Sequence, residues 1–248
     1  MTARSARAAS QLDWAAPWLA PYREGGQRVA SSLADGRPLA QALNVVLASG
    51  PAFPLAAGPL RFVDPDEQPP GEAYEAFIAR TACVPTRDNL HDLFNALVWL
   101  RFPALKRRLN ELQAEQIAQA GVGATRGAVR DALTLFDENA ALWRAPPCLV
   151  GALRVRDWHA LFVTHRSAWR DAQLMLFGHA LLDKLTQPRK AITAHLWPMP
   201  DAPEALTPEL FASKSYLPLP VLGVPGWWPA NESEGFYDDP GVFRAARG

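Results

Sequence analysis

Asn89-Leu-His-Asp-Leu-Phe-Asn-Ala-Leu-Val-Trp-Leu-Arg101, followed by Phe102-Pro103, begins the segment of residues 89–118 from which the fold can best be predicted. Asp88 or Asn89 can cap a helix from Leu90, and a proline suits the first position of a second helix. Apolar residues recur at helical spacing in both halves; they are Leu90, Phe94, Leu97 and Val98, then Leu105, Leu109, Leu112 and Ile117. The sequence therefore predicts two successive helices, over residues 90–100 and 103–118.

Polar side chains interrupt the apolar pattern of both helices. His91 and Asn95 are four residues apart, as are Lys106 and Asn110, so each pair shares one helix face. In an antiparallel helix pair, both polar pairs could point into one crevice. A histidine titrates near neutrality, and a neighbouring carboxylate such as Asp92 can fix its tautomer. The alternative is that these side chains cap and bridge helices within a polar core layer.

Two later segments supply further candidates. Asp137 belongs to an Asp-Glu-Asn sequence that suits either a catalytic acidic cluster or a turn. His179 lies among apolar residues, as a core histidine does, with Lys184 nearby. Our leading hypothesis is a hydrolase whose polar crevice is built from His, Asp, Asn and Lys side chains. We assign catalytic roles to His91 (general base or ligand), Asp92 (its orienter), Asn95 (substrate positioning), Lys106 (offset of anionic charge), Asp137 and His179, and substrate binding to Asn89, Asn110 and Lys184.

The rest of the chain predicts an α+β fold that is predominantly helical, with a small β-hairpin or small antiparallel sheet and long Pro-rich loops. We expect an irregular N-terminal arm with one short helix over residues 1–72, packed on a main domain over residues 73–248, the two forming one structural unit. Residues 132–136 and 140–143 predict the hairpin, with Asp137-Glu138-Asn139 as its turn. Further helices are expected at 38–48, 72–79, 148–155, 157–170 and 172–186, and strands at 60–63 and 190–196.

Composition excludes several classes of protein. The 248 residues carry 25 basic and 25 acidic side chains, which argues against a nucleic-acid partner. No apolar run is long enough to span a bilayer and no secretory signal is recognised, so we expect a soluble, cytoplasmic protein. The sequence contains no phosphate-binding Gly-Lys-Ser/Thr loop and no Gly-x-Ser-x-Gly elbow. The sequence does not identify a cofactor. Distant segments could hold a divalent metal, but no metal-ligand spacing is met.

Two alternatives to an enzyme remain open, because the sequence does not decide whether the protein is one. The Pro- and Trp-rich C-terminal segment, residues 215–248, could present an apolar surface to a protein partner in a non-catalytic interaction module. The basic patch at residues 101–108, flanked by aromatic side chains, could bind phosphate or nucleic acid, although a solvated helix face has the same composition.

Several motifs together resemble a known family. They are Tyr74-Glu-Ala-Phe-Ile, Val84-Pro-Thr-Arg-Asp-Asn-Leu-His-Asp-Leu-Phe-Asn-Ala-Leu-Val-Trp, Phe102-Pro-Ala-Leu-Lys, Leu133-Thr-Leu-Phe-Asp-Glu-Asn, Gly178-His-Ala-Leu-Leu-Asp-Lys, Leu219-Pro-Val-Leu-Gly-Val-Pro-Gly-Trp, Phe236-Tyr-Asp-Asp and Val242-Phe-Arg. Over residues 70–244 the chain resembles the proteobacterial family called domain of unknown function 3025. The resemblance implies membership and no mechanism. From the resemblance we expect glycine after Asp-Glu-Asn, where this chain has Ala140, and alanine suits a tight turn less well.

Overall fold

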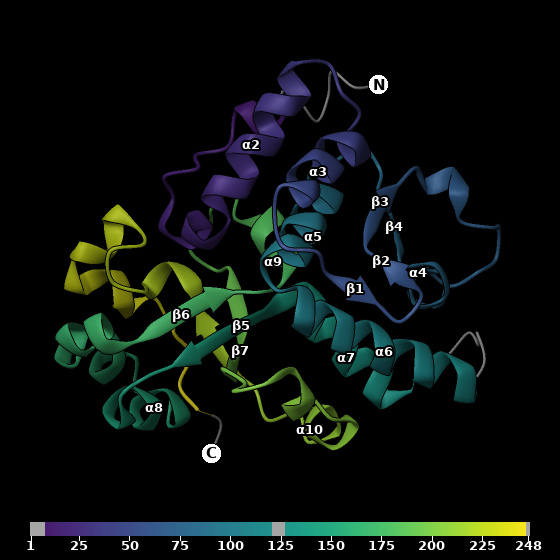
Figure 1. Cartoon of the computed structure of the whole chain (residues 1–248). Helices are drawn as coiled ribbons and strands as arrows, with labels where there is room; N and C mark the ends of the chain where they lie inside the picture. The colour runs from purple at the N-terminus through teal and green to yellow at the C-terminus, as the bar shows by residue number, and fades with distance from the viewer. Residues whose placement is uncertain (1–7, 121–126, 247–248) are drawn as a thin grey trace.

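The computed structural model describes residues 8–120 and 127–246, and shows a predominantly helical α+β protein (Figure 1). Its helices are α2 (Arg23–Ala34), α3 (Leu39–Ala48), α4 (Tyr74–Thr81), α5 (Leu90–Arg101), α6 (Pro103–Ala120), α7 (Ala128–Asn139), α8 (Pro147–Arg154), α9 (His179–Lys184) and α10 (Pro208–Ala212). Its strands are β1 (Pro54–Leu55), β2 (Gly58–Pro59), β3 (Arg61–Val63), β4 (Cys83–Pro85), β5 (Ala140–Arg144), β6 (Gln173–Leu176), β7 (Thr193–Pro198) and β8 (Leu217–Pro220).

The largest sheet has four strands in the order β6-β5-β7-β8. The central strand β5 pairs antiparallel with β6 and parallel with β7, so that Leu142 lies opposite both Met175 and Trp197. Residues 140–143 are all buried. A strand covered on both faces reads as a continuous apolar run, which explains the sequence Ala-Ala-Leu-Trp at this point. Two small pairs, β1 with β2 and β3 with β4, lie away from this sheet, next to α4 (Figure 1).

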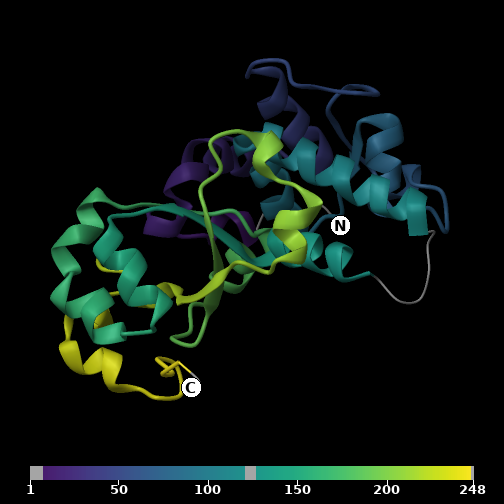
Figure 2. The ribbon, with the colours of Figure 1, turned by 90° about the horizontal axis from the view of Figure 1, so that it is seen from below.

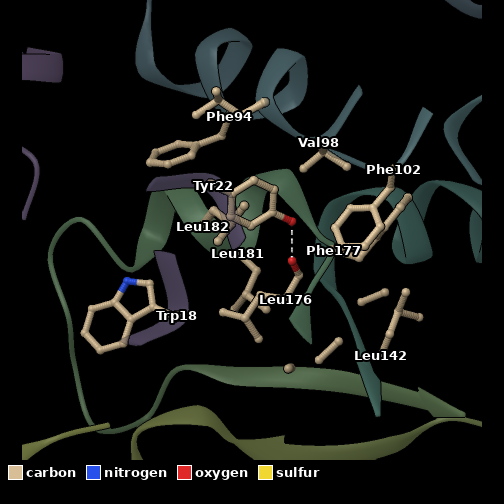
Figure 3. Packing of buried hydrophobic residues seen from close by; sticks show 14 of the residues in the cluster. Trp18, Tyr22, Phe94, Val98, Phe102, Leu142, Leu176, Phe177, Leu181 and Leu182 are labelled. Carbon is tan, nitrogen blue, oxygen red and sulfur yellow. Dashed lines mark hydrogen bonds between the residues drawn. The ribbon is translucent and has the colours of Figure 1, made fainter. Parts of the chain in front are cut away.

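One hydrophobic cluster joins the N-terminal segment to the rest of the protein. Trp18 and Tyr22 are buried beside Phe94 of α5 and Phe177, which follows β6 (Figure 3). The Tyr22 hydroxyl donates a hydrogen bond to the carbonyl of Leu176, at the end of β6. This contact satisfies the polar tip of a buried tyrosine and connects the N-terminal segment to the sheet.

The helices over residues 90–101 and 103–120 lie where the sequence places them, but the hairpin predicted near residues 130–143 is wrong. Residues 128–139 form helix α7, and β5 follows it without an intervening turn. Ala132, Leu133 and Phe136 are buried at helical spacing, so the side chains that suggested a strand form the inner face of a helix. The Asp-Glu-Asn sequence closes the last turn of α7.

Three other predictions also differ from the structure. The helix expected over residues 172–186 is divided into β6 and α9, which are separated by Phe177 and Gly178. Residues 157–170 contain a π-turn over Ala160–Thr164 and a 3₁₀ segment from Arg166, where we expected one helix. The arm described as irregular contains the twelve-residue helix α2, whose two glycines lower its intrinsic propensity while allowing Trp14 to pack against Gly26. In each case tertiary packing overrides local preference.

Figure 2 shows the C-terminal segment and α8 gathered at one end of the molecule, and residues 50–120 at the other. Residues 1–7, part of the segment in which no secretory signal is recognised, lie outside the described residues. Within the described ranges, none of the helices combines the length and apolar character needed to cross a bilayer. Cys83 is buried, Cys148 is exposed, and both are free thiols.

Candidate active site

A cavity of about 480 Å³ lies between α4, α5, α7 and the start of α9. Its volume is in the range that holds small-molecule ligands. The structure brings five of the predicted catalytic residues to its wall: His91, Asp92, Asn95, Asp137 and His179. These residues come from three helices that are separated by up to 88 positions in the sequence.

Two histidines meet at this wall. His179 begins α9, and its Nδ1 lies 2.8 Å from the carbonyl oxygen of Asp137. Because a carbonyl only accepts, Nδ1 of His179 carries the proton and Nε2 presents a lone pair. The Nε2 of His91, in the first turn of α5, lies 3.1 Å from that Nε2 and donates to it. Helices α5 and α9 lie side by side and hold the two rings together (Figure 1).

Gly178 allows the chain before α9 to pass close to the end of α7. A Cβ atom placed on Gly178 would lie 2.5 Å from both the amide nitrogen of Asn139 and the carbonyl oxygen of Glu138. The amides of Phe177 and Gly178 both donate to the carbonyl of Ala140, which fastens the start of α9 to the junction of α7 and β5. This crossing places the His179 ring against the last turn of α7, where carbonyl groups lack partners within the helix.

The carboxylate of Asp137 begins a buried chain of hydrogen bonds. Lys106 Nζ donates to Asp137 Oδ1 over 2.6 Å and to Asn95 Oδ1 over 2.8 Å. The amide Nδ2 of Asn95 then donates to the hydroxyl of Tyr74 over 2.9 Å. The Lys106 side chain is only 5% exposed, so this ion pair is well shielded from water. Asp137 thus organises two chains: one from its carboxylate to Tyr74, and one from its carbonyl to the histidine pair.

Burial and charge set the protonation states of these groups. Burial lowers the pKa of His179 to about 4, although the nearby Asp137 carboxylate opposes this shift, so the ring is neutral near pH 7. Burial also disfavours the charged form of Asp137, but Lys106 and His179 outweigh it and hold the pKa of Asp137 below its usual range. Burial raises the pKa of Tyr74, which keeps its hydroxyl protonated.

His91 is more accessible than its partner. Its side chain is 39% exposed, and its Nδ1 lies 4.0 Å from Oδ2 of Asp183 on α9. Burial raises the pKa of Asp183, while the nearby His91 opposes that shift. Because Nε2 of His91 faces His179, Nδ1 is the nitrogen left for proton exchange.

The predicted role of Asp92 as orienter requires its carboxylate to contact the His91 ring, and it does not. Its carboxylate instead accepts from the backbone amide, Nε and Nη2 of Arg87 at 2.7–3.1 Å. Adjacent helical residues point about 100° apart, which explains why neighbours in the sequence face different partners here. Asn89 caps α5 by accepting from the Asp92 amide over 2.8 Å and does not line the cavity.

Two more predicted residues lie outside the cavity. Asn110 donates to the carbonyl of Glu75 and joins α6 to α4. Lys184, on the last turn of α9, is absent from the cavity wall. Glu138, part of the Asp-Glu-Asn cluster weighed above, lines the cavity, as do Tyr74, Glu75 and Arg87, which the sequence analysis missed. The missed residues lie in two of the motifs that carry the family resemblance, Tyr74-Glu-Ala-Phe-Ile and Val84-Pro-Thr-Arg.

The donor set does not form a metal site in the described residues. No group of three or more His, Cys, Asp or Glu side chains is arranged there to hold a metal ion. The two facing imidazoles are instead satisfied by a hydrogen bond between them.

The basic patch and the C-terminal segment, on which the two alternatives to an enzyme rest, both make contacts within the protein. Lys106 of the basic patch points into the interior, while Arg107 and Arg108 lie within 3.6–3.7 Å of Glu111 on their own helix. In the C-terminal segment, residues 217–220 form strand β8, and Val221 and Leu222 are buried. Among the described residues, the exposed large hydrophobic side chains are Val45 and Val155, both outside that segment.

Comparison with known proteins places the chain in a family. No curated protein and no solved structure matches it. A family model described as "Protein of unknown function (DUF3025)" matches residues 60–209 and 204–247, which is most of the chain. The matched region contains α4–α9 and with them every residue of the histidine pair and the Asp137–Tyr74 chain. By this match, the protein belongs to the DUF3025 family.

Proposed function

We propose that the protein is an enzyme, a hydrolase of esters or amides, with His91 as its general base. The observation that carries the proposal is the contact between the two imidazoles. His179, fixed by the Asp137 carbonyl, accepts from Nε2 of His91 and so holds that ring with Nδ1 unprotonated. A histidine held in one tautomer beside an open cavity is the arrangement that general base catalysis requires.

In the proposed reaction, Nδ1 of His91 removes a proton from a water molecule, which attacks the substrate's carbonyl carbon. The resulting imidazolium donates from Nε2 to neutral His179, and Asp183, 4.0 Å from Nδ1, stabilises its charge. The bond from the carbonyl carbon to the leaving group then breaks, and the imidazolium returns the proton to that group. The products are a carboxylic acid and an alcohol or amine.

Tyr74 supplies the complementary donor in this proposal. Its hydroxyl oxygen accepts from Asn95, which leaves the O–H proton to be donated to the substrate's carbonyl oxygen as negative charge develops there. Lys106 polarises Asn95 from behind, and charge at one end of a hydrogen-bond chain strengthens the donors along it. Asn95 and Lys106 therefore act through Tyr74 as positioning residues.

The test is hydrolysis of a panel of fluorogenic ester and amide substrates, each assayed with and without divalent metal ions. The variants are His91→Ala and His91→Gln, with His159→Gln as the control because that histidine is exposed and lies outside the cavity. We expect both His91 variants to lose about 10²–10⁴-fold in kcat, the usual contribution of a general base, and the control to lose none. Full activity in both variants, with folding intact by circular dichroism, would remove His91 from the mechanism.

A further inference from the structure

Among the described residues, the basic side chains on or beside the cavity wall, Arg87 and Lys106, are each paired with an acid. Arg87 binds both carboxylate oxygens of Asp92, with Nε 3.1 Å and Nη2 3.0 Å away. Lys106 binds Asp137. The two basic side chains that an anionic ligand would need are therefore occupied by the protein's own acids, and pairing another anion there would uncover a buried carboxylate.

Two acids on the cavity wall have no such partner in the part of the chain that the structure describes. Glu75, on α4, and Glu138, at the end of α7, both line the cavity. Within residues 8–120 and 127–246, neither side-chain carboxylate takes part in a hydrogen bond or a salt bridge, whereas Asp92 and Asp137 are both paired. The unpaired charge on the wall is thus that of these two carboxylates.

We propose that the cavity selects a substrate that carries a positive charge, an amine or a guanidinium, with Glu75 and Glu138 as the specificity-determining residues. This inference rests on the proposed function, because it names the class of ester or amide that the site hydrolyses. A cavity of about 480 Å³ accommodates a compound the size of an amino-acid derivative. Unpaired carboxylates at its wall attract cations and repel phosphate and carboxylate groups.

The probes are a matched pair, Nα-acetyl-arginine amide and Nα-acetyl-citrulline amide, which have nearly the same shape and differ in charge. Isothermal titration calorimetry on the full chain measures the affinity of each, with Nα-acetyl-glutamate amide as the anionic member of the series. We expect the arginine compound to bind about tenfold more tightly than the citrulline compound. Each of the two carboxylates should contribute a factor of about two to five to this difference in affinity. The preference should weaken as salt is raised.

The variants are Glu75→Gln and Glu138→Gln, with Glu234→Gln as the control because it is exposed in the C-terminal segment. Each of the first two should reduce the arginine preference by about two- to fivefold, and the control should leave it unchanged. Equal affinity for the arginine and citrulline compounds, tighter binding of the glutamate compound, or an undiminished preference in both variants would overturn the proposal.

The two proposals fail in different ways. If the arginine preference persists in wild type and in His91→Gln while no ester or amide is hydrolysed, the hydrolase proposal is wrong and the cationic site stands. If cationic and neutral esters are hydrolysed at equal kcat/KM, the hydrolase proposal stands and the charge selectivity is wrong.

Discussion

The substitution Gly178→Ala tests the chain crossing on which the whole site depends. A methyl group at this position would lie 2.5 Å from the Asn139 amide nitrogen and the Glu138 carbonyl oxygen, and 2.6 Å from the Asn139 Cα. All three are backbone atoms, so no side-chain rotation relieves the contact. The junction of α7 with β5 and the start of α9 must therefore move apart.

The expected cost follows from that geometry. Ordinary contacts of this kind lie near 3.5 Å, so the two segments must separate by about 1 Å. Overpacking of this kind costs about 1–3 kcal/mol, and the rigid backbone on both sides favours the upper end. For a chain of this length that corresponds to a fall in Tm of about 4–10 °C. The same movement would lengthen the contact between His179 and the Asp137 carbonyl, which is 2.8 Å in the structure.

The assay is urea denaturation, combined with NMR of the histidine ring nitrogens to report on the hydrogen bonds of His179. The matched control is Gly151→Ala within α8, where an added Cβ meets nothing within 4 Å. That substitution should stabilise the protein by about 0.5–1 kcal/mol, since alanine is the better helix former. If Gly178→Ala is as stable as wild type and keeps the His179 signals unchanged, the crossing is not as close as described.

Two further predictions concern the buried charges. Lys106→Met should destabilise the protein by about 3–5 kcal/mol in chemical denaturation, because it leaves the Asp137 carboxylate buried without its ammonium partner. The double variant with Asp137→Asn should recover at least half of that loss. A loss below about 1 kcal/mol in the single variant would contradict the burial of the pair. The second concerns pH: because the pKa of His179 is about 4 when folded and about 6.5 when unfolded, the unfolded chain takes up a proton between these values and the folded chain does not. The free energy of unfolding should therefore fall by about 3 kcal/mol as the pH falls from 6.5 to 4, and by clearly less in His179→Gln. Urea denaturation at several pH values measures both. The same pH dependence in both proteins would show that His179 is not the group responsible.

The sequence alone was sufficient for elements whose signal is local. Helices α5 and α6 could be predicted because cap, apolar spacing and proline position all agree over residues 89–118. The segment around Leu133 could not be, because a short apolar run followed by Asp-Glu-Asn suits both a strand with a turn and a helix end. The choice depends on which face is buried, and α9 and α10 pack against that face.

For the candidate site, the sequence indicated which residues belong to it but not which of them contact one another. The sequence singled out His91, Asn95, Lys106, Asp137 and His179 by type, because polar groups inside apolar helices are costly unless they are paired or used. It could not determine their partners, and it paired His91 with its neighbour Asp92.

The pairing of His91 with His179, 88 positions away, was decided only by tertiary structure. Hydrogen-bond partners depend on distances of a few tenths of an ångström, which the packing of α5, α7 and α9 sets. Residue spacing along one helix fixes the face on which a side chain lies. It does not determine what another helix brings to that face.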